Sequence, residues 1–208
     1  QAAGDEPEVV RHKHLPHEEW TEAIFYHGHR PEDVHLLRAN GAPDDGSNRD
    51  YKAMLNRLRT SDMREEENWA WIQEEMDVQN FVDYQFFQVF FANNDNGNIR
   101  FWREASPQGK WRWILYDTDW GLHDATHRTL RHVTDPEGTG AHNAFSTTIW
   151  NRLVQNPKFV KLFLQRAAYH LNNTFRTERF LAVIDRLSQQ YAPEIERDRI
   201  RWKQREGR

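Results

Sequence analysis

The sequence contains no cysteine, which excludes disulfide bonds and metal sites built from thiolates. It also lacks an apolar run of about 18 residues, the length that a membrane-spanning helix needs. An excess of basic charge is missing as well, because 28 Lys and Arg stand against 32 Asp and Glu. The formal net charge of -4 argues against a bulk electrostatic grip on nucleic acid or anionic membrane. We therefore expect no nucleic-acid partner and no membrane span.

Aromatic residues, in contrast, are abundant. The chain has 12 Phe, 9 Trp and 6 Tyr among 208 residues, although 29% of its residues are charged. A disordered chain carries few aromatic residues, so this composition indicates a folded protein with a polar surface and an aromatic core. The length fits one domain, or a large part of one, with a sizeable core.

The first half of the chain has mainly helical patterns. Residues 1–16 are expected to form a tail, residues 17–38 to form two short helices interrupted at Pro31, and residues 41–48 to form a loop. Apolar spacing of three and four predicts amphipathic helices over 49–59 and 64–76. A third helix, over 81–93, is apolar on nearly every face and is expected in the core. Asp77 is its predicted N-cap, with Asn80 at the third helical position.

The pattern changes at residue 99. Segments 99–105 and 110–116 are rich in aromatic and branched residues and predict a β-hairpin, in which Trp102 and Trp111 are expected to pair across the strands. Residues 122–142 contain little apolar material and are expected to form a long loop. Further helices are expected over four segments: 144–156, 158–175, 178–191 with Thr177 as cap, and a last one opened by Pro193.

Oxygen-bearing side chains flank the predicted hairpin. Asp95 and Asn98 precede its first strand, and Asp117 and Asp119 follow its second strand. Because paired strands lie about 4.8 Å apart, the two loops are expected to be neighbours. Hard oxygen donors suit Mg²⁺, which usually completes its coordination shell with water and substrate phosphates. The sequence therefore predicts a place where a magnesium ion and a phosphate could meet.

Phosphoryl transfer uses such groups in a similar order along the chain. One Asp orients the attacking hydroxyl, and an Asn and a second Asp hold the metal. The order here is Asp95, Asn98, a strand pair and then Asp119. The other interpretation is that Asp95 belongs to a tight turn while Asp117 and Asp119 are merely solvated. Chemistry alone leaves both interpretations open.

The sequence also resembles the CotH kinase family, the spore-coat-type atypical protein kinases found widely in bacteria. The resemblance covers roughly residues 48 to 202 without a break in register. It is carried by six segments in one order: 80–95, 97–103, 110–122, 153–175, 178–187 and 192–202. Several independent motifs in one order make the resemblance specific.

The resemblance implies a fold and a domain organisation. The expected fold class is α+β and predominantly helical, with a protein-kinase-like C-lobe, a small β-hairpin, and an N-lobe that is largely missing. Residues 1–47 are expected to form a tail and connecting helices, and residues 48–208 the catalytic-side helical domain.

The resemblance also implies roles for individual residues. Asp95 matches the catalytic Asp, and Asn98 and Asp119 match residues that bind the cofactor. Asp117, Asp119 and Asn98 would hold Mg²⁺ or Mn²⁺ on ATP. Trp120 stands where kinases have the Phe of Asp-Phe-Gly, so it is expected to pack beside Asp119.

Two features depart from the family pattern. The loop between Asp95 and the strand is only NGN, which is shorter than usual in the family. In addition, none of the six Lys residues lies in a strand pattern upstream of Asp95, where the family has a phosphate-contacting Lys. We therefore expect a fragment that binds ATP poorly by itself.

Three functions follow as hypotheses. The first is Mg²⁺-dependent transfer of a phosphoryl group from ATP to Ser or Thr hydroxyls of a protein substrate. The alternative is a catalytically inactive pseudokinase, a scaffold module of a surface or coat assembly. The third is a metal-dependent hydrolase that uses the same carboxylates with water as nucleophile. The family resemblance suggests export or association with the cell surface or spore coat.

Overall fold

The computed structural model describes residues 27–39, 41–93, 98–124, 126, 128–133 and 144–202. The expected N-terminal tail, most of the first expected helical segment, and Asp95 lie outside these residues. The chain divides into two compact units, Gln1–Phe163 and Leu164–Arg208. Each unit is described by itself.

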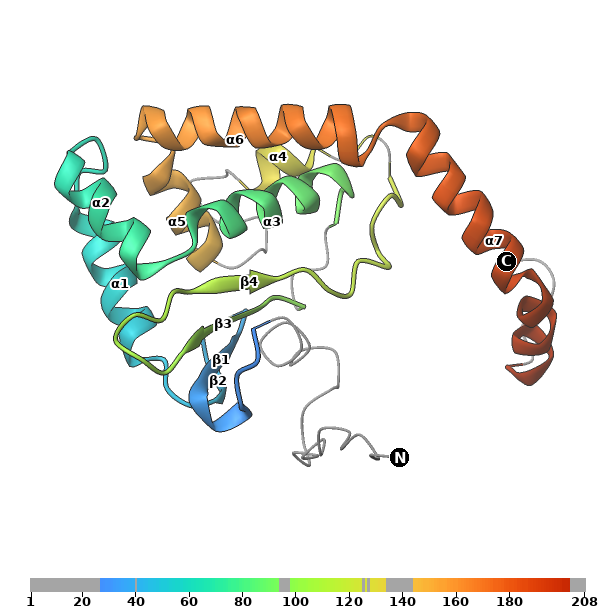
Figure 1. Ribbon diagram of the computed structural model, residues 1–208, viewed down its shortest axis with the longest axis horizontal. Coiled ribbons are helices and arrows are strands. Elements are labelled where there is room, and N and C mark those ends of the chain that lie inside the picture. The colour runs from blue at the N-terminus through green and yellow to red at the C-terminus, as the bar shows by residue number, and fades with distance from the viewer. Residues whose placement is uncertain are drawn as a thin grey trace, which may run out of the picture. The chain divides into compact units, whose positions relative to one another are not determined.

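The first unit contains a four-stranded antiparallel sheet with the order β2-β1-β3-β4 (Figure 1). Its strands are β1 (Val34–Arg38), β2 (Pro43–Asp45), β3 (Arg100–Glu104) and β4 (Arg112–Ile114). A short 3₁₀ turn over Pro31–Asp33 leads into β1. The predicted hairpin is present as β3 and β4, although β4 is shorter than expected.

Helices of the same unit lie in two stretches of the chain. Between β2 and β3 come α1 (Arg49–Thr60), α2 (Glu66–Glu75) and α3 (Val78–Phe90). After β4 come α4 (Thr129–Val133), α5 (Ala144–Leu153) and the first part of α6 (Pro157–Tyr169). The expectation of an α+β, mainly helical protein agrees with this architecture.

One face of the sheet carries the main core. Phe101 and Trp113 are direct partners on β3 and β4, and their rings stack with centroids 5.6 Å apart. Tyr51 of α1 contacts the Phe101 ring at 4.5 Å, and Phe81 of α3 contacts the Trp113 ring at 4.7 Å. All four side chains are almost completely buried. Many of the aromatic side chains thus pack the helices against the sheet.

The expected pairing of Trp102 with Trp111 is wrong. Trp102 is the partner of Arg112, and its ring lies in a second cluster with Val34 and Leu36. Trp111 belongs to the main core instead. Neighbouring positions on the two strands alternate between faces, so a shift of one residue in register separates the two indoles.

The expectation of a helix in the described part of residues 31–38 is also wrong. After the 3₁₀ turn, Val34–Arg38 is a strand whose residues pair one by one with β3, from Val34 with Glu104 to Arg38 with Arg100. The loop expected over 41–48 contains β2. The apolar spacing in VHLLR fits a helix as well as a strand. Pairing with β3, which lies far away in the sequence, makes this segment a strand.

Three smaller corrections concern the segments after the hairpin. The expected loop over 122–142 contains the short helix α4, which packs against α3 and α5. Thr177 is the first residue of α7 (Thr177–Arg201) and not its cap, since Arg176 takes that position. Pro193 lies inside α7 and does not start a new helix. Proline removes one hydrogen bond, and the good helix formers around it, such as Gln190 and Glu194, maintain the helix.

The second unit comprises the end of α6, a π-helical turn over His170–Thr174, and α7. His170 is buried, and its ring nitrogens lie 3.2 Å from Arg166 Nη2 and 3.0 Å from Thr174 Oγ1. α7 has no buried residue. Among the described residues, no helix combines the length and the apolar character that crossing a bilayer requires.

Candidate functional site

The start of α3 is tied to strand β4 by a side-chain amide. Asp77 caps the helix as predicted, because its carboxylate accepts a hydrogen bond of 2.9 Å from the backbone N–H of Asn80. The Asn80 side chain then accepts a hydrogen bond of 2.6 Å from the Trp113 N–H and donates one of 3.1 Å to the Trp113 carbonyl. Asp77 also forms an ion pair with Arg112. The strand that leads to Asp117 is therefore fixed to the helix that leads to Asp95.

The end of α3 holds the segment after β4. The Phe91 carbonyl accepts a hydrogen bond from the Leu122 N–H. Just before Leu122, the Gly121 N–H donates a hydrogen bond of 2.8 Å to the Thr118 carbonyl, which closes a turn that contains Asp119. A β-carbon at Gly121 would lie 2.8 Å from that Thr118 oxygen and 3.1 Å from the Phe91 oxygen. The glycine is thus required for this close approach.

The two loops that flank the hairpin are in direct contact. The Asn98 side-chain amide donates a hydrogen bond to the Asp117 carboxylate. Asp117 adopts a left-handed backbone conformation, with φ of 49°, which Asp tolerates better than most residues. Both side chains reach solvent rather than the core. The hairpin therefore brings together one amide and one carboxylate that the sequence places 19 positions apart.

The remaining candidate residues are placed as follows. Asp119 lies in the turn after Asp117 and is exposed. Trp120 is 60% exposed, so the expectation that it packs beside Asp119 in the manner of a buried Phe is wrong. The backbone hydrogen bonds of Gly121 and Leu122 hold the turn instead. Asp95 lies outside the described residues, between Asn93, which is buried, and Asn98.

Two tyrosines near the end of the hairpin interact with each other. Tyr116 immediately precedes Asp117, and Tyr84 of α3 is buried. Burial, followed by the influence of Tyr116, raises the pKa of Tyr84 well above its ordinary value of 10.0. Tyr84 therefore stays neutral throughout the physiological range and belongs to the main core.

A cluster of two arginines and one aspartate, which was missed from the sequence, lies at the end of the sheet near Asn98. Arg100 begins β3 two residues after Asn98, and its Nε lies 2.7 Å from Asp44 Oδ2. Arg38, its cross-strand partner, also forms an ion pair with Asp44, whose side chain is only 4% exposed. Two guanidinium groups share one carboxylate, so this trio carries a net positive charge. No sequence signal indicated it, because Asp44 falls in a turn-rich segment.

The donor atoms at the site are oxygen atoms of the kind that Mg²⁺ and Mn²⁺ prefer. Within the described residues, no group of three or more acidic or His side chains converges on one point. Asn98 and Asp117 nevertheless supply two adjacent oxygen-bearing side chains, with Asp119 in the next turn. This donor set fits a hard divalent cation better than zinc, which favours His and Cys.

A comparison with known protein families gives one match. A protein-family model described as "CotH kinase protein" matches residues 28–208. No curated protein matches the chain, and no solved structure matches it. The matched region includes the described strands, both flanking loops and all the candidate residues. The chain belongs to the CotH kinase family.

Proposed function

We propose that this protein transfers the γ-phosphoryl group of ATP to Ser or Thr hydroxyls of a protein substrate, as a CotH-type atypical protein kinase domain. One observation carries the proposal. Asn98 contacts Asp117 at the end of the hairpin, and the turn with Asp119 is hydrogen-bonded to Phe91, the residue after α3. These contacts lie beside Phe91 and Asn98, which stand on either side of the segment with Asp95 in the sequence, and this arrangement supports the proposal.

Each residue has a role in this proposal. Asp95 orients the substrate hydroxyl and accepts its proton. Asn98, Asp117 and Asp119 hold Mg²⁺ or Mn²⁺, which neutralises negative charge on the phosphates of ATP when it is bound. Asn98 donates its side-chain N–H to the Asp117 carboxylate, which holds the two side chains beside each other. The family's link to surface and coat assemblies makes a protein of such an assembly the expected substrate.

The test is a calorimetric titration of ATP in the presence of Mg²⁺ or Mn²⁺, followed by a phosphorylation assay. Because the chain is expected to bind ATP poorly by itself, we expect weak but metal-dependent nucleotide binding in the wild type and its loss in Asp119→Ala. Asp185→Ala, which removes an exposed carboxylate on α7, is the control and should bind as the wild type does. Metal-dependent binding that survives Asp119→Ala would refute the assigned role of this residue.

A second candidate is a catalytically inactive scaffold module. It is favoured by the exposure of Asp119 and of Trp120, because catalytic sites usually exclude water around the reacting groups. The Asp95→Asn variant separates the two functions. Loss of phosphorylation with nucleotide binding retained supports the kinase. An Asn variant as active as the wild type would contradict catalysis by Asp95, and a wild type without activity would favour the scaffold.

A further inference from the structure

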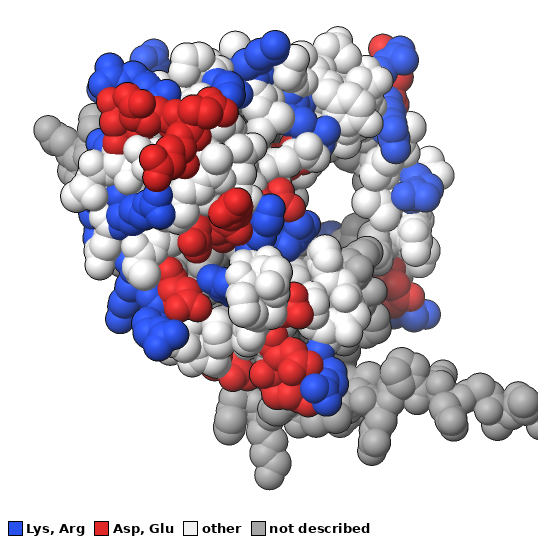
Figure 2. All heavy atoms as spheres, turned by 60° about the vertical axis from the view of Figure 1, so that its left-hand side comes forward, with Lys and Arg blue, Asp and Glu red and all other residues white. Residues whose placement is uncertain are grey.

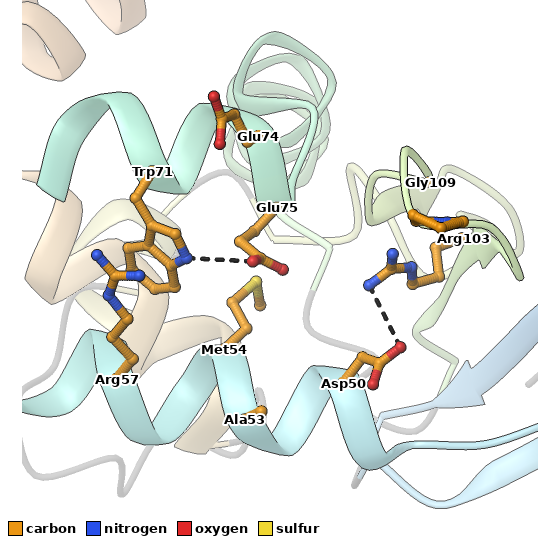
Figure 3. Close-up of a pocket in the computed structure, with 10 residues that line it drawn as sticks. Asp50, Ala53, Met54, Arg57, Trp71, Glu74, Glu75, Arg103 and Gly109 are labelled. Atoms are coloured by element: carbon orange, nitrogen blue, oxygen red, sulfur yellow. Dashed lines mark hydrogen bonds and ion pairs between the residues drawn. The ribbon is translucent and has the colours of Figure 1, made fainter. Parts of the chain in front are cut away.

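A pocket of about 480 Å³ is lined by α1 and α2. The side of Figure 1 on which these helices lie comes forward in Figure 2, where acidic and basic side chains are interspersed. Asp50, Met54 and Arg57 line it from successive turns of α1, and Trp71 and Glu75 line it from α2 (Figure 3). The turn between β3 and β4 closes one end. This turn is the opposite end of the hairpin from Asn98 and Asp117, so the α1–α2 pocket is separate from the candidate site.

The basic side chains of the pocket already have interactions within the protein. The Arg57 guanidinium lies 4.1 Å from the centroid of the Trp71 ring, a cation–π contact. Arg103 has only 7% of its side chain exposed, donates to the Ser106 carbonyl at 3.1 Å, and lies 3.7 Å from Asp50. Arg57 is an exposed residue whose guanidinium lies over the Trp71 ring, and the Arg103 guanidinium points toward Asp50 (Figure 3).

The acidic side chains are in the opposite situation. Glu75 accepts a hydrogen bond of 3.1 Å from the Trp71 indole N–H. Within the described residues, neither Glu75 nor its neighbour Glu74 has a basic side chain at ion-pair distance. Asp50 has only long contacts, at 3.4 Å to the exposed Arg49 and at 3.7 Å to Arg103. Figure 3 shows Glu75 and Asp50 on opposite sides of the gap, with Glu74 pointing elsewhere.

The lining around Glu75 and Asp50 indicates which ligand would fit, one with both an apolar part and a positive charge. Met54, which is almost completely buried, and the edge of the Trp71 ring form the apolar part of the pocket lining beside Glu75. Five of the ten lining residues are charged, whereas pockets for small molecules are predominantly apolar. A lysine or arginine side chain meets both conditions, because it combines an aliphatic stem with a cationic head.

We propose that the α1–α2 pocket is a docking site for a lysine or arginine side chain of a protein partner. The stem lies against Met54 and Trp71, and the cationic head lies between Glu75 and Asp50. This inference is independent of phosphoryl transfer, since it uses none of the residues assigned to that reaction. It applies to a kinase that anchors its substrate away from the reacting hydroxyl and equally to a scaffold that binds a neighbour.

The test follows the indole N–H signal of Trp71 by NMR, with the signal assigned from the Trp71→Phe variant. The probes are three capped tripeptides, Ac-Gly-Arg-Gly-NH₂, Ac-Gly-Lys-Gly-NH₂ and the uncharged Ac-Gly-Gln-Gly-NH₂. We expect a saturable shift with the first two peptides and none with the third. The shift should weaken when salt is added, because part of the attraction is between partly exposed charges.

Two matched variants locate the interaction. Glu75→Gln keeps an acceptor for the Trp71 N–H but removes the charge, and should weaken binding of the arginine peptide about fivefold. Glu67→Gln makes the same change at an exposed position of α2 outside the pocket and should leave binding unchanged. Equal losses in both variants, an equal shift with the glutamine peptide, or no saturable shift at all would overturn the proposal.

Discussion

Replacement of Asn80 by alanine tests the link between α3 and β4. The Asn80 amide makes two hydrogen bonds to the main chain of Trp113, a residue that is 1% exposed. β4 is an edge strand of the described sheet, so no further strand can take over these two main-chain groups. Each hydrogen bond contributes about 1 kcal/mol, and a buried group left without a partner costs about 1–3 kcal/mol. We expect Asn80→Ala to lower the free energy of unfolding by about 2–4 kcal/mol.

The assay is equilibrium unfolding in urea, followed by tryptophan fluorescence and by circular dichroism. The midpoint should fall while the slope of the transition stays the same, because the surface exposed on unfolding hardly changes. Gln79→Ala is the control, since Gln79 is the preceding residue of the same helix and is exposed. Its effect should stay within about 0.5 kcal/mol.

A second variant probes the direction of the hydrogen bonds. Asn80→Asp keeps an acceptor for the Trp113 N–H but places an oxygen opposite the Trp113 carbonyl, where a donor is needed. At neutral pH this variant should be at least as unstable as Asn80→Ala, and it should regain stability as the introduced carboxyl is protonated. A loss below about 1 kcal/mol in Asn80→Ala would show that the amide does not hold the strand.

Two further predictions concern local structure. Gly121→Ala should break the hydrogen bond between the Leu122 N–H and the Phe91 carbonyl, because the added β-carbon would lie 2.8 Å from the Thr118 oxygen and 3.1 Å from the Phe91 oxygen. Hydrogen exchange at the Leu122 amide should therefore accelerate. An unchanged exchange rate would contradict this prediction. Hydrogen bonds from Arg64 lower the pKa of Asp62 from 3.8 to about 2, so the stabilisation is complete above pH 3.8 and lost as the pH falls toward 2. An NMR titration should find this low midpoint for Asp62, and Arg64→Ala should raise it; equal midpoints in the two proteins would refute the cause.

Elements with a strong local signal could be predicted from the sequence. The helices α1 and α2 follow from apolar spacing, and the cap of α3 follows from Asp77. The hairpin could be predicted because its two strands are close in the sequence. Local chemistry thus determines these elements, and the surrounding fold agrees with it.

The errors occurred where distant parts of the chain decide the structure. β1 is a strand because β3 is its partner, and nothing within Val34–Arg38 records that pairing. Register likewise separated Trp102 from Trp111, since a shift of one residue exchanges the faces. For the site, the closeness of Asn98 and Asp117 followed from hairpin geometry alone. The roles of Asp95, Asn98, Asp117 and Asp119 remain predictions.

The pairing of β1 with β3 has a consequence for the kinetics of folding. β3 and β4 are joined by a short turn, whereas β1 and β3 are separated in the chain by β2 and by three helices. Pairs that are distant in sequence pay a larger entropy of loop closure before they gain contacts, and such topologies fold slowly. We therefore expect the hairpin to form early and β1 to join the sheet late. Until then, the edge of β3 that β1 covers is exposed to pairing with other chains.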